Sequence, residues 1–299
     1  MGNIELLFQA PALALQLVID GVLIGSVFAL AAYGLALVWG VMNVINIAQG
    51  EFVMLGGYVA LYVTKVGINP FAGIPAAALV LFALGWVIYR AVVYRVVDKD
   101  LFISLLATFG VGILLAQLAN ELFGADVQSV DPGLGTFYLL HNAVTVSAVK
   151  LVTCGLTLVV GAILMLFLKR TRLGQAIRAT AQNPRAARVM GVDTDRIYAM
   201  TFAINAAICG AAGALVVMTW VIHPYLGLTY TVRSFMIVIV AGLGNLAAVI
   251  VAGLGLGVAE NIAGFILGAE AQSAFLYSLL VAILLFRSVM LRRERKVLR

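Results

Sequence analysis

Eight side chains with hydrogen-bonding or acidic groups interrupt long apolar stretches of this 299-residue chain. They are Asn43, Asn46, Gln49, Glu51, Asn205, Asn245, Glu260 and Asn261. Amide and carboxyl groups in apolar surroundings can hydrogen-bond a passing solute or carry a proton, and burying them without a partner is costly. We therefore treat these eight residues as candidates for a translocation path.

Two of these groups are carboxylic acids, and each has more than one interpretation. Glu51 lies near one end of its apolar stretch, where a cap or a hydrogen bond between helices explains it as well as transport does. Glu260 lies deeper, and a structural partner or a protonated carboxyl is an alternative to a transport role. The sequence leaves these alternatives open.

Enzymatic chemistry has little support in the sequence. No serine–histidine pair, aspartate pair or metal-ligand spacing occurs inside the apolar stretches, and the two cysteines indicate small packing residues. A phosphate-binding loop needs a glycine before its lysine, and none of the five lysines follows a glycine. The chain is therefore predicted to be no enzyme and to bind no metal or ATP itself, so that ATP energy would come from a partner.

The composition is that of an integral membrane protein. Hydrophobic residues make up 64% and charged residues 11% of the chain, whereas soluble domains carry about 25% charged residues. The mean hydropathy is +1.11. The apolar stretches are continuous and lack the alternation of barrel strands, so they predict an all-α, polytopic bundle of about 8–10 transmembrane helices.

Nine helices are expected within these stretches, at roughly 13–40, 48–66, 73–95, 101–123, 144–168, 197–219, 231–248, 249–268 and 273–290. The seventh and eighth are short, and "AGLGNLAA" interrupts them, so a pair of broken helices is an alternative. Small residues recur four apart, as at Gly21, Gly25 and Ala29, and predict close helix packing. Gly253, Gly255 and Gly257 indicate either tight packing or the wall of a narrow path.

The basic residues predict the orientation. With the N-terminus outside and nine crossings, sixteen Lys and Arg residues lie on the cytoplasmic side and three on the other. The cytoplasmic set includes a basic tail at about 291–299, so the C-terminus is expected in the cytoplasm. The net charge of +6 then reflects topology, and it does not indicate nucleic-acid binding.

One polar segment stands apart, "KRTRLGQAIRATAQNPRAARVMGVDTDR" at 169–196, which holds seven of the nineteen basic residues. Leu173 and Ile177, four residues apart, predict a short amphipathic helix. Asn183 and Pro184 suit the cap and first position of a second helix, and Gly191 suits its end. Fixing the topology needs only a few positive charges, so two capped helices predict a docking element.

Two stretches, "INIAQGEFVMLGGY" and "RLGQAIRATAQNPRAARVMGVDTDRIYAMTFAINAAICGAAGAL", resemble the Liv-type (LivH-like) permeases, the branched-chain amino-acid membrane subunits of ABC importers. The resemblance covers nearly the whole chain. It implies an importer-type ABC permease with a single transmembrane domain over 1–299, in a bacterial cytoplasmic (inner) membrane. It also implies four protein partners: a second, LivM-like permease, two ATPase subunits that hold ATP and Mg, and a periplasmic substrate-binding protein. Membrane lipid surrounds the spans.

The second stretch matches the coupling helices that dock on the ATPases in this family. The matching residues are Leu173, Gly174, Ile177, Arg178, Ala181, Pro184, Ala187, Met190 and Gly191. Two departures concern the substrate: Gln49 stands where the family often has histidine, and "AGLGNLAAV" differs from the family's glycine-rich pattern. The expected substrate is a branched-chain or other apolar amino acid. Urea or a short amide, and an ion-coupled secondary transporter using Glu51 or Glu260, are the alternatives.

Overall fold

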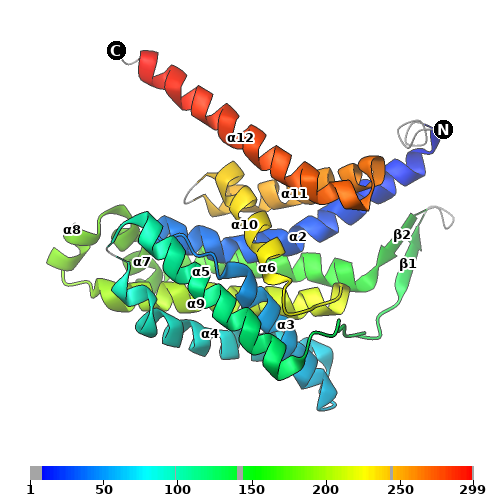
Figure 1. Ribbon diagram of the computed structural model, residues 1–299, viewed down its shortest axis with the longest axis horizontal. Coiled ribbons are helices and arrows are strands. Elements are labelled where there is room, and N and C mark those ends of the chain that lie inside the picture. Colours follow the sequence, from blue (N-terminus) through cyan, green and yellow to red (C-terminus); the bar gives the residue numbers. More distant parts are fainter. Residues whose placement is uncertain (1–8, 98, 140–143, 243–244, 298–299) are drawn as a thin grey trace.

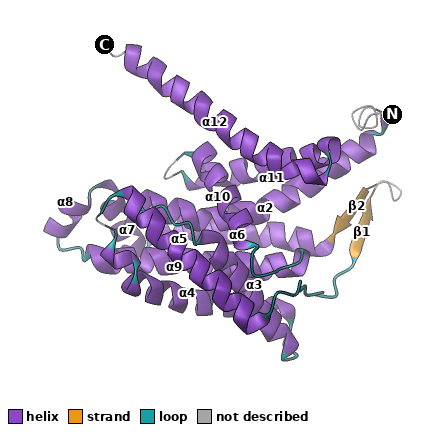
Figure 2. Ribbon diagram, viewed as in Figure 1, coloured by secondary structure: helices purple, strands orange, loops and turns teal. Residues whose placement is uncertain are grey.

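Helices make up most of the computed structural model, which describes residues 9–97, 99–139, 144–242 and 245–297 (Figure 2). The long helices are α2 (Pro11–Met42), α3 (Gln49–Lys65), α4 (Gly73–Ala91), α5 (Leu101–Phe123), α6 (Ala148–Arg170), α9 (Thr194–Thr219), α10 (Gly227–Ala241), α11 (Leu246–Leu267) and α12 (Ala269–Val297). The short elements are η1 (Pro70–Ala72), η2 (Val93–Arg95), α7 (Arg172–Gln182), α8 (Pro184–Val189), β1 (Thr136–Leu139) and β2 (Val144–Ser147).

Within the described residues, six helices are long and apolar enough to cross a membrane, namely α2, α4 with its flanking turns, α5, α6, α9 and α11. The predicted all-α, polytopic membrane bundle is thus confirmed. Helices α3 and α10 have 17 and 15 residues, fewer than the about 20 that a full crossing needs. The predicted basic tail at 291–299 continues α12 as far as Val297, and residues 298–299 lie outside the described part of the chain.

Two sequence predictions were wrong in detail. Residues 144–147 begin no helix but form β2, which pairs antiparallel with β1, and the backbone of Thr145 exchanges two hydrogen bonds with the side chain of Gln16. The seventh and eighth helices are interrupted within "AGLGNLAA", as predicted, but α10 ends at Ala241 and α11 begins at Leu246, rather than at 248 and 249. Gly242 (φ +82°) ends α10, and the Asn245 side chain accepts from Ala248 N and so starts α11 earlier.

Helices α2 and α9 form the centre of the bundle (Figure 1). In their most apolar stretches 89% and 83% of the residues are buried, against 28–33% in the other four spanning helices. The two helices run in opposite directions, α2 toward the end of the molecule that carries α7 and α8, and α9 toward the end that carries the β-hairpin. Each is followed by a non-helical segment and then by a short helix, α3 or α10.

The non-helical segment between α2 and α3 lies inside the bundle, and hydroxyl groups supply its hydrogen bonds. Thr108 of α5 accepts from Ile47 N at 3.1 Å and donates to Ile45 O at 2.9 Å. Thr231 of α10 donates to Ile47 O at 3.0 Å and accepts from Gly50 N at 2.9 Å. Two threonines therefore replace the bonds that a helix would have supplied to this backbone.

Small residues allow the closest helix contacts, as the sequence predicts. A Cβ at Gly21 would lie 2.6 Å from Val258 Cα, and a Cβ at Gly253 would lie 2.6 Å from Ala29 Cβ, so α2 and α11 are in backbone contact. A Cβ at Gly210 in α9 would likewise lie 2.7 Å from Ala77 O in α4. For Gly253, tight packing is therefore the correct interpretation, whereas Gly255 faces open space.

We expect Gly253→Ala to lower the thermal unfolding midpoint of the purified protein in detergent, because the new methyl group forces α2 and α11 apart. Overpacking of this kind costs about 1–3 kcal/mol. Gly255→Ala in the same helix is the matched control, since nothing lies within 4 Å of its new Cβ, and it should leave the midpoint unchanged or slightly raised. Equal losses in both variants would refute the close-contact explanation.

Candidate functional site

The α7–α8 element is defined by a cap at each junction. The Thr171 hydroxyl accepts from Gly174 N at 2.9 Å at the start of α7, and the Asn183 side chain accepts from Ala186 N at 3.0 Å at the start of α8. Pro184 takes the first position of α8, where its missing N–H has no cost. The predicted pair of short helices joined at Asn183 and Pro184 is confirmed.

The end of the element also follows the sequence prediction. Gly191 adopts the left-handed conformation (φ +84°) after α8. The Asp193 side chain then accepts from Arg196 N at 3.1 Å and caps α9. Side-chain caps therefore define where α7 begins and where the chain passes from α8 into α9.

Helix α7 is attached to the bundle through Gly174, Ile177 and Thr180, which are buried at a spacing of three. A Cβ at Gly174 would lie 2.5 Å from Leu168 Cα, so α7 rests directly on the last turn of α6. Leu173 is half-buried beside this face, whereas Arg178 and Ala181 are exposed.

Helix α8 projects from one end of the molecule (Figure 1). Ala187 is buried, whereas Val189 and Met190 are 86% and 82% exposed. The exposed Arg185 and Arg188 come from the same short helix, and Arg188 also bonds to Thr194 and pairs with Asp195 at 3.5 Å. We call Arg185, Arg188, Val189 and Met190 the α8 tip, an apolar pair next to positive charge and uncovered in this chain.

Three of the predicted path residues lie in the closed core instead. Asn46, Gln49 and Asn205 are fully buried. The Gln49 amide donates to Ala31 O and to Cys209 Sγ, both at 2.8 Å, and Cys209 Sγ donates to Asn205 Oδ1 at 3.6 Å. These side chains join α2, α3 and α9, so in this chain they connect helices.

Glu51 lies where α3 meets the start of α10. Its carboxyl group fills the space that a side chain on Gly227 would occupy, and the residue is only 9% exposed. The first turn of a helix carries a positive partial charge, which favours an acid at this position. Among the described residues, Glu51 Oε2 has no hydrogen-bond partner.

Glu260 has the structural partner that the sequence left as one alternative. It forms an ion pair with Arg233 of α10 and accepts from Gln272 Nε2 of α12 at 3.1 Å. Arg233 also lies over the ring of Phe28, 4.8 Å from its centroid. The side chain of Arg233 is 15% exposed, so this cation is largely buried within the bundle.

The remaining path candidates are dispersed. Asn261 donates to Leu17 O at 2.7 Å and joins α11 to α2. Asn43 ends α2 in the left-handed conformation (φ 52°), and Asn245 caps α11, and both are exposed. The eight residues therefore do not form one continuous polar path within the described part of the chain.

Several residues at these sites were missed by sequence reasoning. Thr108, Thr231 and Arg233 carry the bonds of the buried segment and of Glu260, and nothing in their local sequence distinguishes them from other polar residues in a helix. Cys209 was interpreted as packing alone, yet it bonds to two side chains. In the part of the chain that the structure describes, no three His, Cys, Asp or Glu side chains are placed to hold a metal ion.

Known proteins of similar sequence are transport permeases. LivH of Escherichia coli (strain K12), a high-affinity branched-chain amino acid transport system permease protein, is 30% identical over 91% of this chain and 92% of its own length. BraD of Pseudomonas aeruginosa, described in the same words, is 30% identical over 91% and 94%. The probable LivH of Methanocaldococcus jannaschii is 28% identical over 78% and 76%.

The solved structure of PsaBC from Streptococcus pneumoniae in complex with Fab aligns with 95% of this chain and 93% of its own, at 14% identity and a TM-score of 0.49, too distant to assign anything to this chain. The family model described as "Branched-chain amino acid transport system / permease component" matches residues 17–284. This multi-pass membrane protein therefore belongs to the family of branched-chain amino acid transport permeases.

Proposed function

We propose that this chain is a permease subunit of an ABC importer for branched-chain or similar apolar amino acids. The observation that carries the proposal is the α7–α8 element, which has a side-chain cap at the start of each helix, rests on α6 and presents an exposed apolar and basic tip. A loop that only fixed topology would need none of these features.

The attachment of α7 supports a route for the motion. When partner ATPases bind ATP and close, they displace the α8 tip, and α7 passes the displacement to α6 through Gly174. Ile177 and Thr180 hold α7 on the bundle. The predicted coupling residues in α8, Pro184 and Ala187, and those directly after it, Met190 and Gly191, then set the shape of the docking surface. Leu173, Arg178 and Ala181 remain predicted parts of the same element.

The proposed orientation places α7 and α8 in the cytoplasm. Helices α4 and α6 end on this side of the molecule (Figure 1), and their last turns hold Arg90 and Lys169, while α7 begins with Arg172. This agrees with an excess of positive charge on the cytoplasmic side. Helix α2 then begins outside, and α12 leads back to the cytoplasmic side. The β-hairpin faces the periplasm, where a substrate-binding protein delivers its ligand.

The proposed path lies between this chain and a second permease subunit. Asn46, Gln49, Asn205 and Glu260 are engaged inside the chain. An aliphatic substrate needs a mostly apolar surface with few polar groups. One apolar helix face from each of the two permease subunits would provide such a surface. The names of the relatives support the substrate class, and two ATPase subunits complete the proposed importer.

We expect Met190→Glu to abolish ATP-dependent amino-acid uptake by the reconstituted importer. The new charge enters the apolar centre of the proposed interface, where one central residue can contribute about 2 kcal/mol or more, a loss in ATPase affinity of at least about thirtyfold. Binding of purified ATPase subunits to the permease measures this loss directly.

Val127→Glu is the matched control, because Val127 is also exposed (60%) but lies next to Gln128, which pairs with Ile222 beyond the end of α9 that is far from α8. This variant should bind the ATPases like wild type. Full uptake and full ATPase binding by Met190→Glu would refute the assignment of the α8 tip as the surface that binds the ATPases.

Variants of the Arg233–Glu260 pair distinguish the hypothesis of ATP-driven import from that of ion-coupled transport. Glu260→Gln alone leaves Arg233 buried and unpaired, and we expect a loss of about 3–5 kcal/mol in stability. The double variant Arg233→Gln/Glu260→Gln has no charge to bury, so it should recover most of the stability and keep uptake in a purified importer. An ion-coupling role of Glu260 instead predicts that the stable double variant transports nothing.

A further inference from the structure

A groove opens between the ends of three spanning helices on the side of α7. Its walls come from the last turns of α2 and α6, from one side of α7 and from the first residues of α11. Its volume is about 350 Å³, within the range of about 300–1,000 Å³ that is usual for sites of small ligands.

The deep walls of the groove are apolar. Leu37 and Val41 contribute from α2, and Met165 and Leu168 contribute from α6. These residues belong to helices that are long and apolar enough to cross a membrane. The groove therefore lies level with the end of the membrane-spanning bundle, where acyl chains and headgroups of lipids meet.

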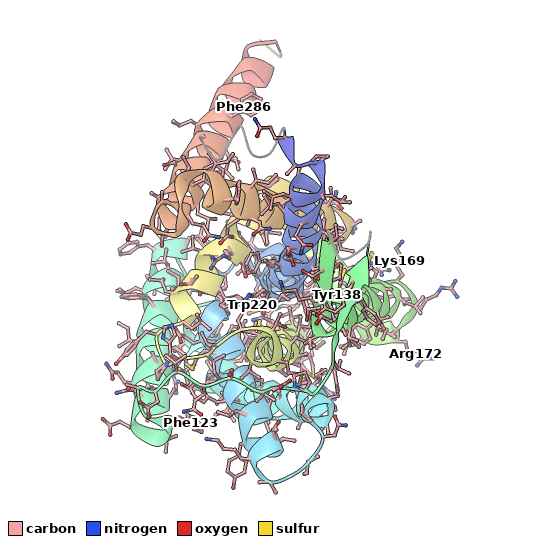
Figure 3. All side chains as sticks on the ribbon, turned by 90° about the vertical axis from the view of Figure 1, so that its right-hand side faces the viewer. Phe123, Tyr138, Lys169, Arg172, Trp220 and Phe286 are labelled. Carbon is pink, nitrogen blue, oxygen red and sulfur yellow. The ribbon has the colours of Figure 1, made fainter. Side chains whose placement is uncertain are left out.

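Two cations, Lys169 and Arg178, lie at the rim of the same groove. Both are exposed, and neither takes part in the ion pairs found among the described side chains. Figure 3 shows Lys169 on the same flank of the molecule as Arg172. Asn245, also in the rim, adds an amide group that can hydrogen-bond an anion.

We propose that this groove binds one anionic phospholipid from the leaflet on the α7 side. The headgroup phosphate lies between Lys169 and Arg178, and an acyl chain covers the wall formed by Leu37, Val41, Met165 and Leu168. Basic pockets between membrane helices recognise anionic headgroups by this combination of charge and depth. Free phosphate would match the cations but would leave the apolar wall uncovered.

The position of the site gives the lipid a structural role. The groove is lined by α7 as well as by α2, α6 and α11, so a bound lipid holds α7 against three spanning helices. The proposal does not depend on ATP coupling, because binding of lipid is a property of this chain alone.

The test uses the full-length protein, purified, delipidated in neutral detergent and titrated with phosphatidylglycerol or phosphatidylcholine while native mass spectrometry counts the bound lipid. One phosphatidylglycerol should bind more tightly than phosphatidylcholine. K169Q/R178Q removes two basic residues that would attract the anionic headgroup, so this variant should bind phosphatidylglycerol about thirtyfold more weakly. The matched control R90Q/R172Q removes two exposed cations outside the groove and should bind like wild type.

A second variant tests the groove itself. Ala181 is exposed and lines the groove, so A181W fills the space while both cations remain, and it should lose the tight phosphatidylglycerol. Excess inorganic phosphate should fail to displace the lipid. The proposal would be overturned if the two lipids bound equally, or if R90Q/R172Q lost as much binding as K169Q/R178Q. It would also be overturned if A181W bound phosphatidylglycerol like wild type, or if phosphate displaced the lipid fully. The unfolding midpoint of each variant identifies misfolding, and if A181W misfolds, the comparison of K169Q/R178Q with R90Q/R172Q decides.

Discussion

A backbone amide inside an apolar bundle must have a hydrogen-bond partner, and the central region of this protein depends on how that requirement is met. The chain leaves helical conformation between Met42 and Gln49, so its backbone groups there lose the hydrogen bonds of a helix. Thr108 and Thr231 supply partners from two other helices. They thereby hold the start of α3 against the start of α10, which brings Glu51 onto Gly227. A similar break after α9 is bridged differently, by the pairing of Ile222 with Gln128.

The second constraint is the distance between backbones. Helices α2 and α9 lie at the centre because glycine and alanine let α11 and α4 approach them closely. In such contacts there is no space for water or for a solute. Several polar groups that enter the bundle bond to one another, as Gln49 does with Cys209, and as Arg233 does with Glu260. This tight packing is consistent with the proposed path on the outside of this core.

The sequence predicted most of the fold because membrane helices are encoded locally. Continuous apolar runs, caps such as Asn183 and the positive φ of Gly191 depend on the residues at those positions and are independent of distant contacts. The function of the polar residues was not predictable in this way. Whether Gln49 faces a path or a neighbour depends on where α9 lies, and a residue's partners in other helices leave no periodic signal. The β-hairpin was missed for the same reason, since β2 is stabilised by β1 and by Gln16.

Helix α8 has only six residues and few buried side chains. A helix of this length is unstable in isolation, because too few hydrogen bonds form to offset the cost of nucleation. Its integrity rests on the Asn183 cap and on the contact of Ala187 with the bundle. Local opening should therefore begin here, and backbone amides of α8 should exchange with solvent faster than those of α7. Contact with a partner at the tip would order α8 at the moment of docking, so part of the binding energy is used to complete the helix.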